Sequence, residues 1–308
     1  MTLNRRDFLK KSVLMGIGAV AASSPLRGLP MAQNLPDLTV VQGPDPGQAV
    51  AKAIETAGGI GRFISRGDTV VVKPNMAWDR RPEQAANTNP QVVASVVRLC
   101  FEGGAGTVKV FDNPTEDARR VYVQSGIAAA ARAVGAKTPY MDSRKFRRIR
   151  LDGEVLKKWE IYLDVIEADK VINIPIAKHH SLAGLTLSMK NWMGAIGGNR
   201  SRLHWKLDES LADLAAFFKP SLTILDCVRI LTANGPQGGS LSYVKVLNTV
   251  VVGTDQVAVD AFGASLFETT AGRPESARRA RRYIQRAASR GIGRMDLENL
   301  HIVKLRLA

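Results

Sequence analysis

The hydrophobic and polar positions of the chain follow two alternating periods. Short apolar runs bounded by Gly, Pro or Asp predict strands, and longer segments with apolar positions three and four apart predict helices. We expect strands at 38–42, 69–73, 107–111, 170–174, 222–226, 246–252 and 301–305. We expect helices at 46–56, 90–102, 126–134, 182–193, 208–218, 255–267 and 274–289. This alternation is typical of an α/β fold with a mainly parallel or mixed sheet flanked by helices.

Residues 144–163 depart from this pattern. Their polar and apolar positions alternate around the turn dipeptide Asp152-Gly153, which predicts a small antiparallel insertion. No repeat or low-complexity linker divides the rest of the chain, and 45% hydrophobic residues in 308 are ample for a core. We therefore expect one α/β domain over residues 33–308.

Residues 1–32 are predicted to be an export signal. Asn4 to Lys10 read NRRDFLK, a twin-arginine signature, and the apolar run 12–24 that follows is short for a membrane span. The triplet 30–32 before Gln33 resembles a cleavage site. We expect export by the twin-arginine (Tat) machinery to the periplasm or another extracytoplasmic space. The alternative is a signal that is retained as a membrane anchor.

The formal net charge of +15 is concentrated in a few segments. Residues 1–32 contribute five basic side chains against Asp7, and residues 273–294 hold eight arginines against Glu275. A solvated helix face explains the arginine segment, and a weak attraction to an anionic membrane surface or an acidic partner is the alternative. No basic motif is interleaved with aromatic residues, so we expect no nucleic-acid partner.

Polar side chains stand at the ends of five predicted strands. They are Lys73 and Asn75, Asp112 and Asn113, residues 175–180, Asp226, and Asp255. In open α/β sheets, ligands bind beyond the carboxyl ends of the strands, where loops carry the chemistry. We therefore expect these ends to converge on one site.

The segment 178–198 carries the strongest signal for a site. Two histidines and a lysine precede a long apolar run whose only charge is Lys190. If the run is helical, Thr186 and Lys190 lie four residues apart, away from the apolar stripe. Burial disfavours an ionised lysine unless an anion meets it. Lys190 is thus a cation for an anionic ligand, or a base or nucleophile of lowered pKa. The alternative is a lysine that ends a helix and extends its charge to solvent.

Several ordered motifs give the chain a resemblance to a known family. They are VVVKPN (70–75), Lys178-x-His180, Lys190-Asn191-x-x-Gly194, His204, Asp226, Asn234-Gly235-Pro236, and Gly253-Thr254-Asp255 with Asp260. From about residue 38 to the C-terminus, the chain resembles the uncharacterised bacterial and archaeal family DUF362. Many relatives carry ferredoxin-like cysteine clusters, which implies redox work for them. Here Cys100 and Cys227 stand alone, so we expect buried free thiols and no intrinsic iron–sulfur cluster.

The motifs and strand ends nominate three sets of site residues. The candidate catalytic residues are Lys190, His180 and His204. The candidate anion-binding residues are Lys73, Asn75, Lys178, Asn191, Asn234 and Gly235. The candidate supporting carboxylates are Asp226, Asp255 and Asp260.

Several of these residues have a second interpretation. A metal bound by His180, His204 and Asp226 is chemically feasible, and the two histidines can equally be acid–base or structural groups. The turn at 234–236 can lie on the surface, and Asp255 can simply cap the helix predicted after it. Asp260, inside that helix, is expected to pair with a cation such as a loop lysine.

The sequence favours a broad function without naming a reaction. It lacks a phosphate loop in strand–loop–helix order, an H-E-x-x-H motif and a G-x-S-x-G motif. We expect an exported enzyme that acts on a small anionic substrate, or binds a cofactor with anionic groups, at the strand ends. The alternative is a non-enzymatic accessory protein that binds a cofactor or metal and serves a redox partner.

Overall fold

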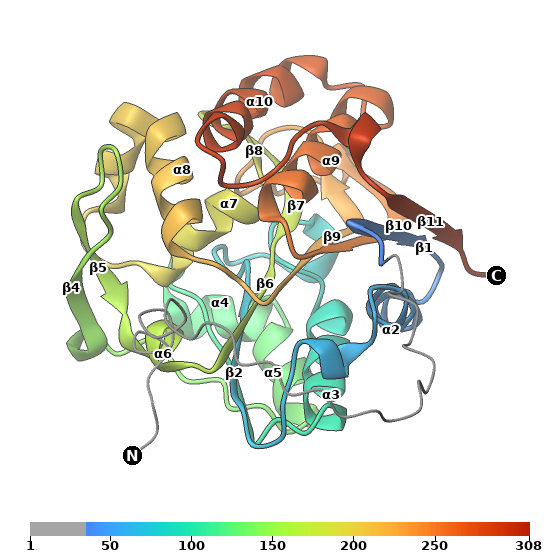
Figure 1. Cartoon of the computed structure of the whole chain (residues 1–308), viewed down its shortest axis with the longest axis horizontal. Coiled ribbons are helices and arrows are strands. Elements are labelled where there is room, and N and C mark those ends of the chain that lie inside the picture. The colour runs from blue at the N-terminus through green and yellow to red at the C-terminus, as the bar shows by residue number, and fades with distance from the viewer. Residues whose placement is uncertain (1–34) are drawn as a thin grey trace, which may run out of the picture. The chain divides into compact units, whose positions relative to one another are not determined.

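A nine-stranded mixed sheet organises the chain in the computed structural model, which describes residues 35–308 (Figure 1). The predicted signal segment 1–32 lies outside the described residues. The main strands run in the order β11 (Ile302–Arg306), β1 (Leu38–Gln42), β10 (Val244–Gly253), β9 (Leu222–Leu231), β6 (Lys170–Ile174), β2 (Thr69–Pro74) and β3 (Thr107–Val110). Strand β7 (Ile176–His180) pairs with β9 and with β8 (Gly184–Thr186).

Most neighbouring strands are parallel. Strand β10 is antiparallel to both β1 and β9, whereas β9, β6, β2 and β3 run in one direction. The predicted α/β class with a mixed sheet is therefore confirmed. The predicted antiparallel insertion is also present, as a separate hairpin of β4 (Phe146–Arg150) and β5 (Lys158–Tyr162).

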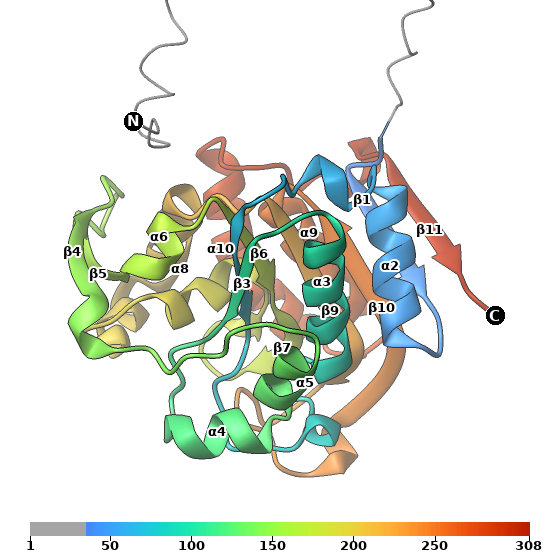
Figure 2. The ribbon, with the colours of Figure 1, turned by 90° about the horizontal axis from the view of Figure 1, so that it is seen from below.

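Helices cover both faces of the sheet because its strands are apolar on both sides. Val70 and Val72 face the core beneath α2 (Pro46–Thr56), α3 (Pro90–Glu102) and α5 (Ile127–Ala133), whereas Val71 faces the opposite core. That opposite side carries α8 (Leu207–Phe217), α9 (Gln256–Thr269) and α10 (Pro274–Ser289). Seen from below, α2 and α3 lie in front of the sheet and α9 and α10 lie behind it (Figure 2).

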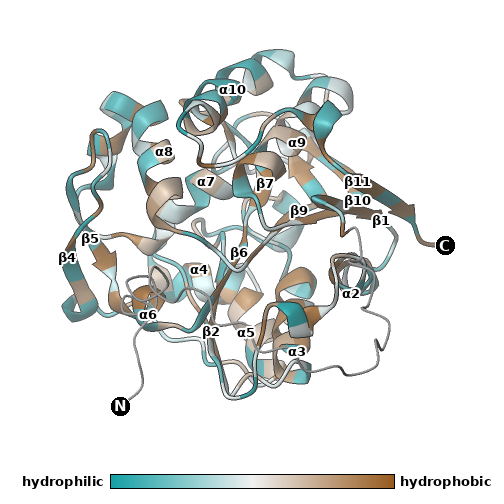
Figure 3. Cartoon of the chain, viewed as in Figure 1, coloured by the Kyte–Doolittle hydropathy of each residue, from teal (hydrophilic) through white to brown (hydrophobic). Residues whose placement is uncertain are grey.

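Hydropathy follows these layers. The central strands are coloured hydrophobic, whereas the β4–β5 hairpin is largely hydrophilic (Figure 3). Cys100 in α3 and Cys227 in β9 are buried free thiols, as expected. Within residues 35–308, no helix is both long and apolar enough to cross a membrane.

The helix predicted at 182–193 is wrong. The chain forms β8, then α7 (Ser188–Asn191) and a 3₁₀ turn over Trp192–Ala195. Strand β8 folds back on β7 with Lys178 opposite Thr186 and His180 opposite Gly184, whose φ of 77° suits glycine. The apolar residues of 183–196 are almost all buried, and a fully buried segment has no solvent face by which its period can be read.

The arginine-rich segment 273–294 forms α10 and the turn after it, and it packs against the rest of the described chain. The predicted thin apolar stripe is present, with Ala277, Ala280, Ile284 and Ala287 buried. The ion pairs of the segment are Arg278–Glu275, Arg281–Glu268, Arg282–Asp208, Arg286–Glu154, Arg290–Asp213 and Arg294–Asp37. Six of the eight arginines thus meet acidic side chains of the same chain.

Candidate functional site

The strand ends open into one cavity. Strands β2 and β6 pair as far as Pro74 and Ile174, after which β7 continues beside β9 instead. The two paths therefore separate, and a cavity of about 350 Å³ lies at this point. Its polar lining comprises Asn75, Asp112, Asn113, Thr115, Lys178, His180, Ser181, Thr186, Lys190, Asn191, Arg200, Ser201 and His204. Of the five strand ends expected to converge, those near Asn75, near Asp112 and Asn113, and at 175–180 contribute residues to this cavity.

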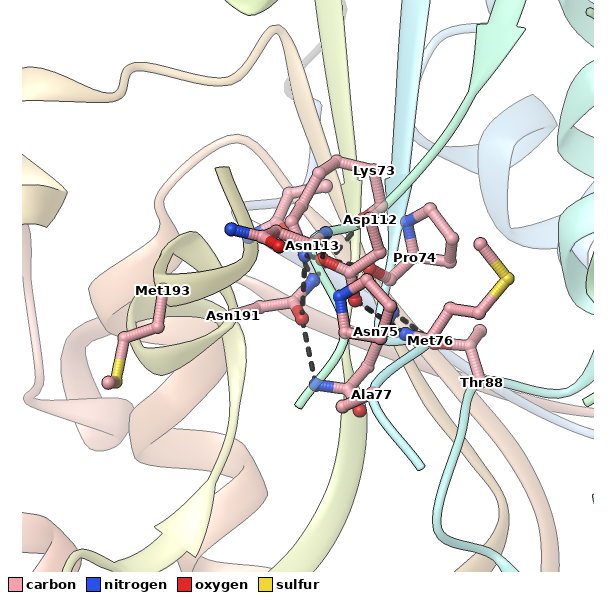
Figure 4. A network of polar contacts seen from close by, with 12 residues as sticks. Lys73, Pro74, Asn75, Met76, Ala77, Thr88, Asp112, Asn113, Asn191 and Met193 are labelled. Carbon is pink, nitrogen blue, oxygen red and sulfur yellow. Dashed lines mark hydrogen bonds and ion pairs between the residues drawn. The ribbon is translucent and has the colours of Figure 1, made fainter. Parts of the chain in front are cut away.

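Lys73 lies beneath this cavity in a closed polar network. Its Nζ is 2.7 Å from Asp112 Oδ1, donates to the carbonyl of Pro74 at 2.8 Å and contacts Asn191 Oδ1 at 3.3 Å. The Asn191 amide accepts from Asn75 through Oδ1 and donates to Asn173 Oδ1 through Nδ2. Figure 4 shows Lys73, Asn75, Asp112 and Asn191 in this network. Burial lowers the pKa of Lys73, and Asp112 opposes that shift.

Asp112 is the anion of this network. It accepts hydrogen bonds from the amides of Met76 at 2.6 Å and Asn113 at 2.9 Å, besides its contact with Lys73. Gly194 packs directly against this pair. A Cβ on Gly194 would lie 1.7 Å from Asp112 Oδ1 and 2.6 Å from Lys73 Nζ, which explains the glycine of the K-N-x-x-G motif.

Asp260 positions α7, which carries Lys190 and Asn191. Its carboxylate accepts the amides of Ser188 at 2.7 Å and Met189 at 3.1 Å, and also the Ser188 hydroxyl. Burial raises the pKa of Asp260 to about 7, although the bonds from Ser188 and Met189 act in the other direction. The prediction that Asp260 pairs with a lysine is wrong, because backbone amides at the start of α7 take the place of the cation.

Lys190 and Arg200, which we call the cation wall, line the cavity, and neither forms an ion pair within residues 35–308. Lys190 is 7% exposed, and its Nζ contacts Met193 Sδ at 3.2 Å. Burial lowers the pKa of Lys190 to about 8, and the charge of Arg200 acts in the same direction. Among the ion pairs of residues 35–308, none involves Lys190 or Arg200.

Arg200 is a site residue that the sequence did not reveal. Its guanidinium donates to the carbonyls of Asn113 at 2.7 Å, Pro114 at 2.8 Å and Met193 at 3.1 Å. Burial lowers its pKa, and Asp112 opposes the shift. These carbonyls orient the group without neutralising its charge. They come from residues as many as 87 positions away, so no local pattern marks Arg200.

Lys178 is more deeply buried than Lys190 and has neutral partners. Its Nζ donates to Asn75 Oδ1 at 3.0 Å and to the carbonyl of Ala86 at 2.5 Å. Burial lowers the pKa of Lys178 well below its usual value, and the charge of Lys190 adds to this effect. With two of its three N–H donors engaged, Lys178 is held against the wall of the cavity.

The two candidate histidines face each other across the cavity. Their rings are nearly parallel, 22° apart, with centroids separated by 6.3 Å. His180 Nδ1 accepts the amides of Leu182 at 3.1 Å and Ala183 at 3.2 Å, whereas His204 Nδ1 lies 3.1 Å from the carbonyl of Ser201. Burial lowers the pKa of both histidines, and the charge of Lys190 adds to it. The two rings are therefore neutral near pH 7.

Asp226 and Asp255 do not belong to the cavity. Asp226 lies within β9 rather than at its end, and its carboxylate accepts the amides of Asn89 at 2.7 Å and Val228 at 2.9 Å. Asp255 caps α9 by accepting the amides of Val257 and Ala258. The predicted metal set of His180, His204 and Asp226 is not assembled, and residues 35–308 contain no other group of three such ligands.

The turn at 234–236 is hydrogen-bonded to the end of β7, next to the cavity. The amide of Gly235 donates to His179 Nδ1 at 3.0 Å, and its carbonyl accepts from Ser181 at 3.2 Å. A Cβ on Gly235 would lie 1.9 Å from the carbonyl oxygen of His179, so the approach requires glycine. Pro236 lines the cavity, but Asn234 and Gly235, predicted to bind the anion, do not.

The motifs that form this site lie in a segment that matches a known family model. A model described as a domain of unknown function, DUF362, matches residues 70–265. The chain belongs to the DUF362 family. The resemblance drawn from its ordered motifs is thereby confirmed.

Relatives of this DUF362 protein extend the comparison. The thylakoid-associated protein sll1697 of Synechocystis sp. is 30% identical over 204 residues, which cover 63% of the chain and 62% of that protein. The chain thus spans less than two thirds of this relative. Two solved structures are similar at low identity. The lactate racemase apoprotein from Thermoanaerobacterium thermosaccharolyticum is 13% identical with a TM-score of 0.45, covering 73% of this chain and 55% of that one. A protein from Thermotoga maritima is 9% identical with a TM-score of 0.36, covering 79% and 58%.

Proposed function

We propose that this DUF362 protein is an exported enzyme that binds a small anionic substrate in the cavity beside β7. One observation carries the proposal: Lys190 and Arg200 line the cavity with no carboxylate paired to either within residues 35–308. A buried positive charge without a counter-ion is costly, and a bound anion offsets that cost. The size of the cavity, about 350 Å³, suits a small molecule.

The histidines support proton transfer as the chemistry. A neutral imidazole whose Nδ1–H donates to a carbonyl keeps a lone pair on Nε2, and His204 has this arrangement through Ser201. His204 is therefore the general base of the proposal. The cation wall would stabilise negative charge that develops on the substrate when the proton leaves. Lys178 and the Lys73 network would hold the cavity in shape.

Thermal unfolding with added anions tests the binding. Phosphate, sulfate, acetate and oxalate are titrated against the wild type, Lys190→Met and the control Lys206→Met. Lys206 is an exposed lysine in the segment of Arg200 and His204 but is not part of the cavity lining. A ligand at 100 times its Kd adds about 2.7 kcal/mol of stability. We expect Tm to rise with at least one anion in the wild type and in Lys206→Met but not in Lys190→Met. Equal rises in all three proteins would contradict the proposal.

Isotope exchange tests the enzymatic part. The purified protein is incubated in D₂O with small carboxylates that bind, and NMR follows replacement of hydrogen at the carbon beside the carboxylate. We expect exchange with the wild type and its loss in His204→Phe, with carboxylate binding retained. Binding without exchange for every carboxylate would favour an accessory role that depends on a partner protein.

The export part of the proposal rests on Asn4 to Lys10 and the apolar run after it. Replacing Arg5 and Arg6 together by Lys keeps the charge but removes the guanidinium pair. We expect the wild type in the extracytoplasmic fraction with a new N-terminus near Gln33, and the variant in the cytoplasm. Equal distribution of the two proteins would contradict Tat export without affecting the anion site.

A further inference from the structure

Positive charge outnumbers negative charge in the lining of the cavity. Among residues 35–308, Asp112 is the only carboxylate that lines it, against the side chains of Lys178, Lys190 and Arg200. Asp112 is already engaged, because Lys73 Nζ lies 2.7 Å from its Oδ1. Within the described part of the chain, the cation wall therefore has no carboxylate of its own.

The mutual influence of these groups gives the same count. The charge of Arg200 lowers the pKa of Lys190, and the charge of Lys190 lowers the pKa of His204. Asp112 is the only carboxylate of residues 35–308 that raises the pKa of Lys178 or Arg200. The positive charges of the cavity thus act mainly on one another.

The excess amounts to at least two positive charges at pH 7. The Lys73–Asp112 pair is neutral as a whole. Lys190 keeps its proton because its pKa is about 8, and an arginine side chain is not deprotonated in proteins. The pKa of Lys178 is lowered well below its usual value, and any proton that it retains adds to the excess.

The two charges of the cation wall lie around one residue, Met193. Lys190 Nζ contacts Met193 Sδ at 3.2 Å, and Arg200 donates to the Met193 carbonyl at 3.1 Å. A monoanion leaves one of these charges uncompensated, whereas a dianion offsets both. We propose that the substrate is a small dianion, a dicarboxylate or a phosphate monoester, that Lys190 and Arg200 bind together. This inference rests on the proposed function, names its substrate class and leaves His204 available as the base.

Matched pairs of ligands separate charge from shape. Oxalate is compared with oxamate and succinate with succinamate, since an amide in place of one carboxylate removes a charge and keeps the size. Methyl phosphate, mainly a dianion at pH 7, is compared with the monoanion dimethyl phosphate. Isothermal titration at pH 7 and constant ionic strength measures the affinities. We expect the dianion of at least one pair to bind at least about tenfold more tightly than its monoanion. The pair with the largest ratio assigns the substrate to dicarboxylates or phosphate monoesters.

Variants then assign the preference to Lys190. In Lys190→Met, the ratio of dianion to monoanion affinity should fall below about threefold, because one of the two charges is gone. Lys190→Arg keeps the charge and should keep the preference. The control Lys206→Met removes an exposed charge outside the cavity lining and should retain the wild-type ratio.

The possible outcomes separate this inference from the proposed function. Equal affinities for the dianion and the monoanion of every pair in the wild type would overturn the inference and leave the anion site intact. An unchanged ratio in Lys190→Met, with folding checked by circular dichroism, would also overturn it. If that variant does not fold, the comparison of ligands in the wild type still decides. If no anion binds the wild type, the proposed function itself fails.

Discussion

Two lysines of the site, Lys73 and Lys190, occupy opposite electrostatic situations in the same region. Lys73 Nζ has a carboxylate at 2.7 Å and a carbonyl at 2.8 Å, and a neighbouring amide oxygen contacts it at 3.3 Å. Lys190 Nζ has a thioether sulfur at 3.2 Å. Both side chains are buried. Within residues 35–308, Lys73 has a carboxylate as ion-pair partner and Lys190 has none.

Because of this difference, we expect Lys73 to contribute to the stability of the fold and Lys190 to bind a ligand. A buried ion pair whose remaining groups are hydrogen-bonded is hard to break, because removal of one partner leaves the other charge uncompensated. An unmatched buried cation weakens the fold until an anion arrives. Asn191 connects the two situations, since it follows Lys190 in α7 and bonds to the Lys73 network. The hydrogen-bonded network around Lys73 thus holds Lys190, which forms no ion pair within residues 35–308, in place.

Lys73→Met should have the largest effect on stability. It leaves Asp112 buried without its cation, and we expect the free energy of unfolding to fall by about 3–5 kcal/mol, measured by urea denaturation at pH 7. The control is Lys52→Met, which breaks the exposed Lys52–Glu55 pair and should cost less than about 1 kcal/mol. Similar small losses in both variants would show that the Lys73 network does not sustain the fold.

Lys190→Met should change stability in the opposite direction. The pKa of Lys190 is lowered from 10.5 to about 8, so at pH 7 the folded protein retains an ammonium that burial disfavours. A shift of that size corresponds to at most about 3 kcal/mol. We expect urea denaturation to show unchanged stability or a gain of about 1–3 kcal/mol, with the anion-induced stabilisation lost. A loss of several kcal/mol would mean that Lys190 has a structural partner.

The pH dependence of anion affinity should distinguish Lys190 from Arg200. Because the pKa of Lys190 is about 8 in the folded protein, its charge disappears as the pH rises through that value. Anion affinity should therefore be flat from pH 6 to 7 and fall up to about tenfold per unit above 8. Lys190→Arg keeps its charge and should remove this fall. Titration calorimetry with oxalate provides the measurement, and an equal fall in both proteins would assign the titration elsewhere.

The stability of the ligand-free protein also depends on the titration of Lys190, but it rises with pH whereas anion affinity falls. Between pH 8 and 10.5 the unfolded chain binds the Lys190 proton and the folded chain does not. The contribution of Lys190 to stability therefore rises with pH across this window. Lys190→Arg should lack that rise, whereas the wild type should show it in the absence of anions.

Elements with local signals were predictable from the sequence. Asp45 before Pro46 and Asn89 before Pro90 cap α2 and α3, and both helices begin and end at the predicted residues. The apolar runs that became β1 and β6 also have their predicted bounds. The segment 182–193 failed because its structure depends on pairing with β7, which is a tertiary contact.

The sequence predicted part of the site. The cavity is lined by Asn75 after β2 and by Lys178 and His180 on β7, as expected for strand ends, and also by Lys190, Asn191 and His204 from the segments after β8. Arg200 was missed because distant carbonyls fix it. The carboxylates Asp226 and Asp260 were misassigned because an aspartate can bind backbone amides as well as a cation. Sequence shows which type of residue is present but not which partner it has.

Asp255→Ala should have the smallest effect and should sharpen the boundary of the site. Asp255 accepts the amides of Val257 at 2.8 Å and Ala258 at 3.1 Å, and also that of Arg294 at 2.7 Å. Loss of such a cap costs about 1 kcal/mol, with an upper range near 2 kcal/mol. Urea denaturation should show this loss, while oxalate affinity should stay within about twofold of the wild type. A large drop in oxalate affinity would place Asp255 in the binding machinery. The expected result separates carboxylates that fasten helices from the cations that remain free for a ligand.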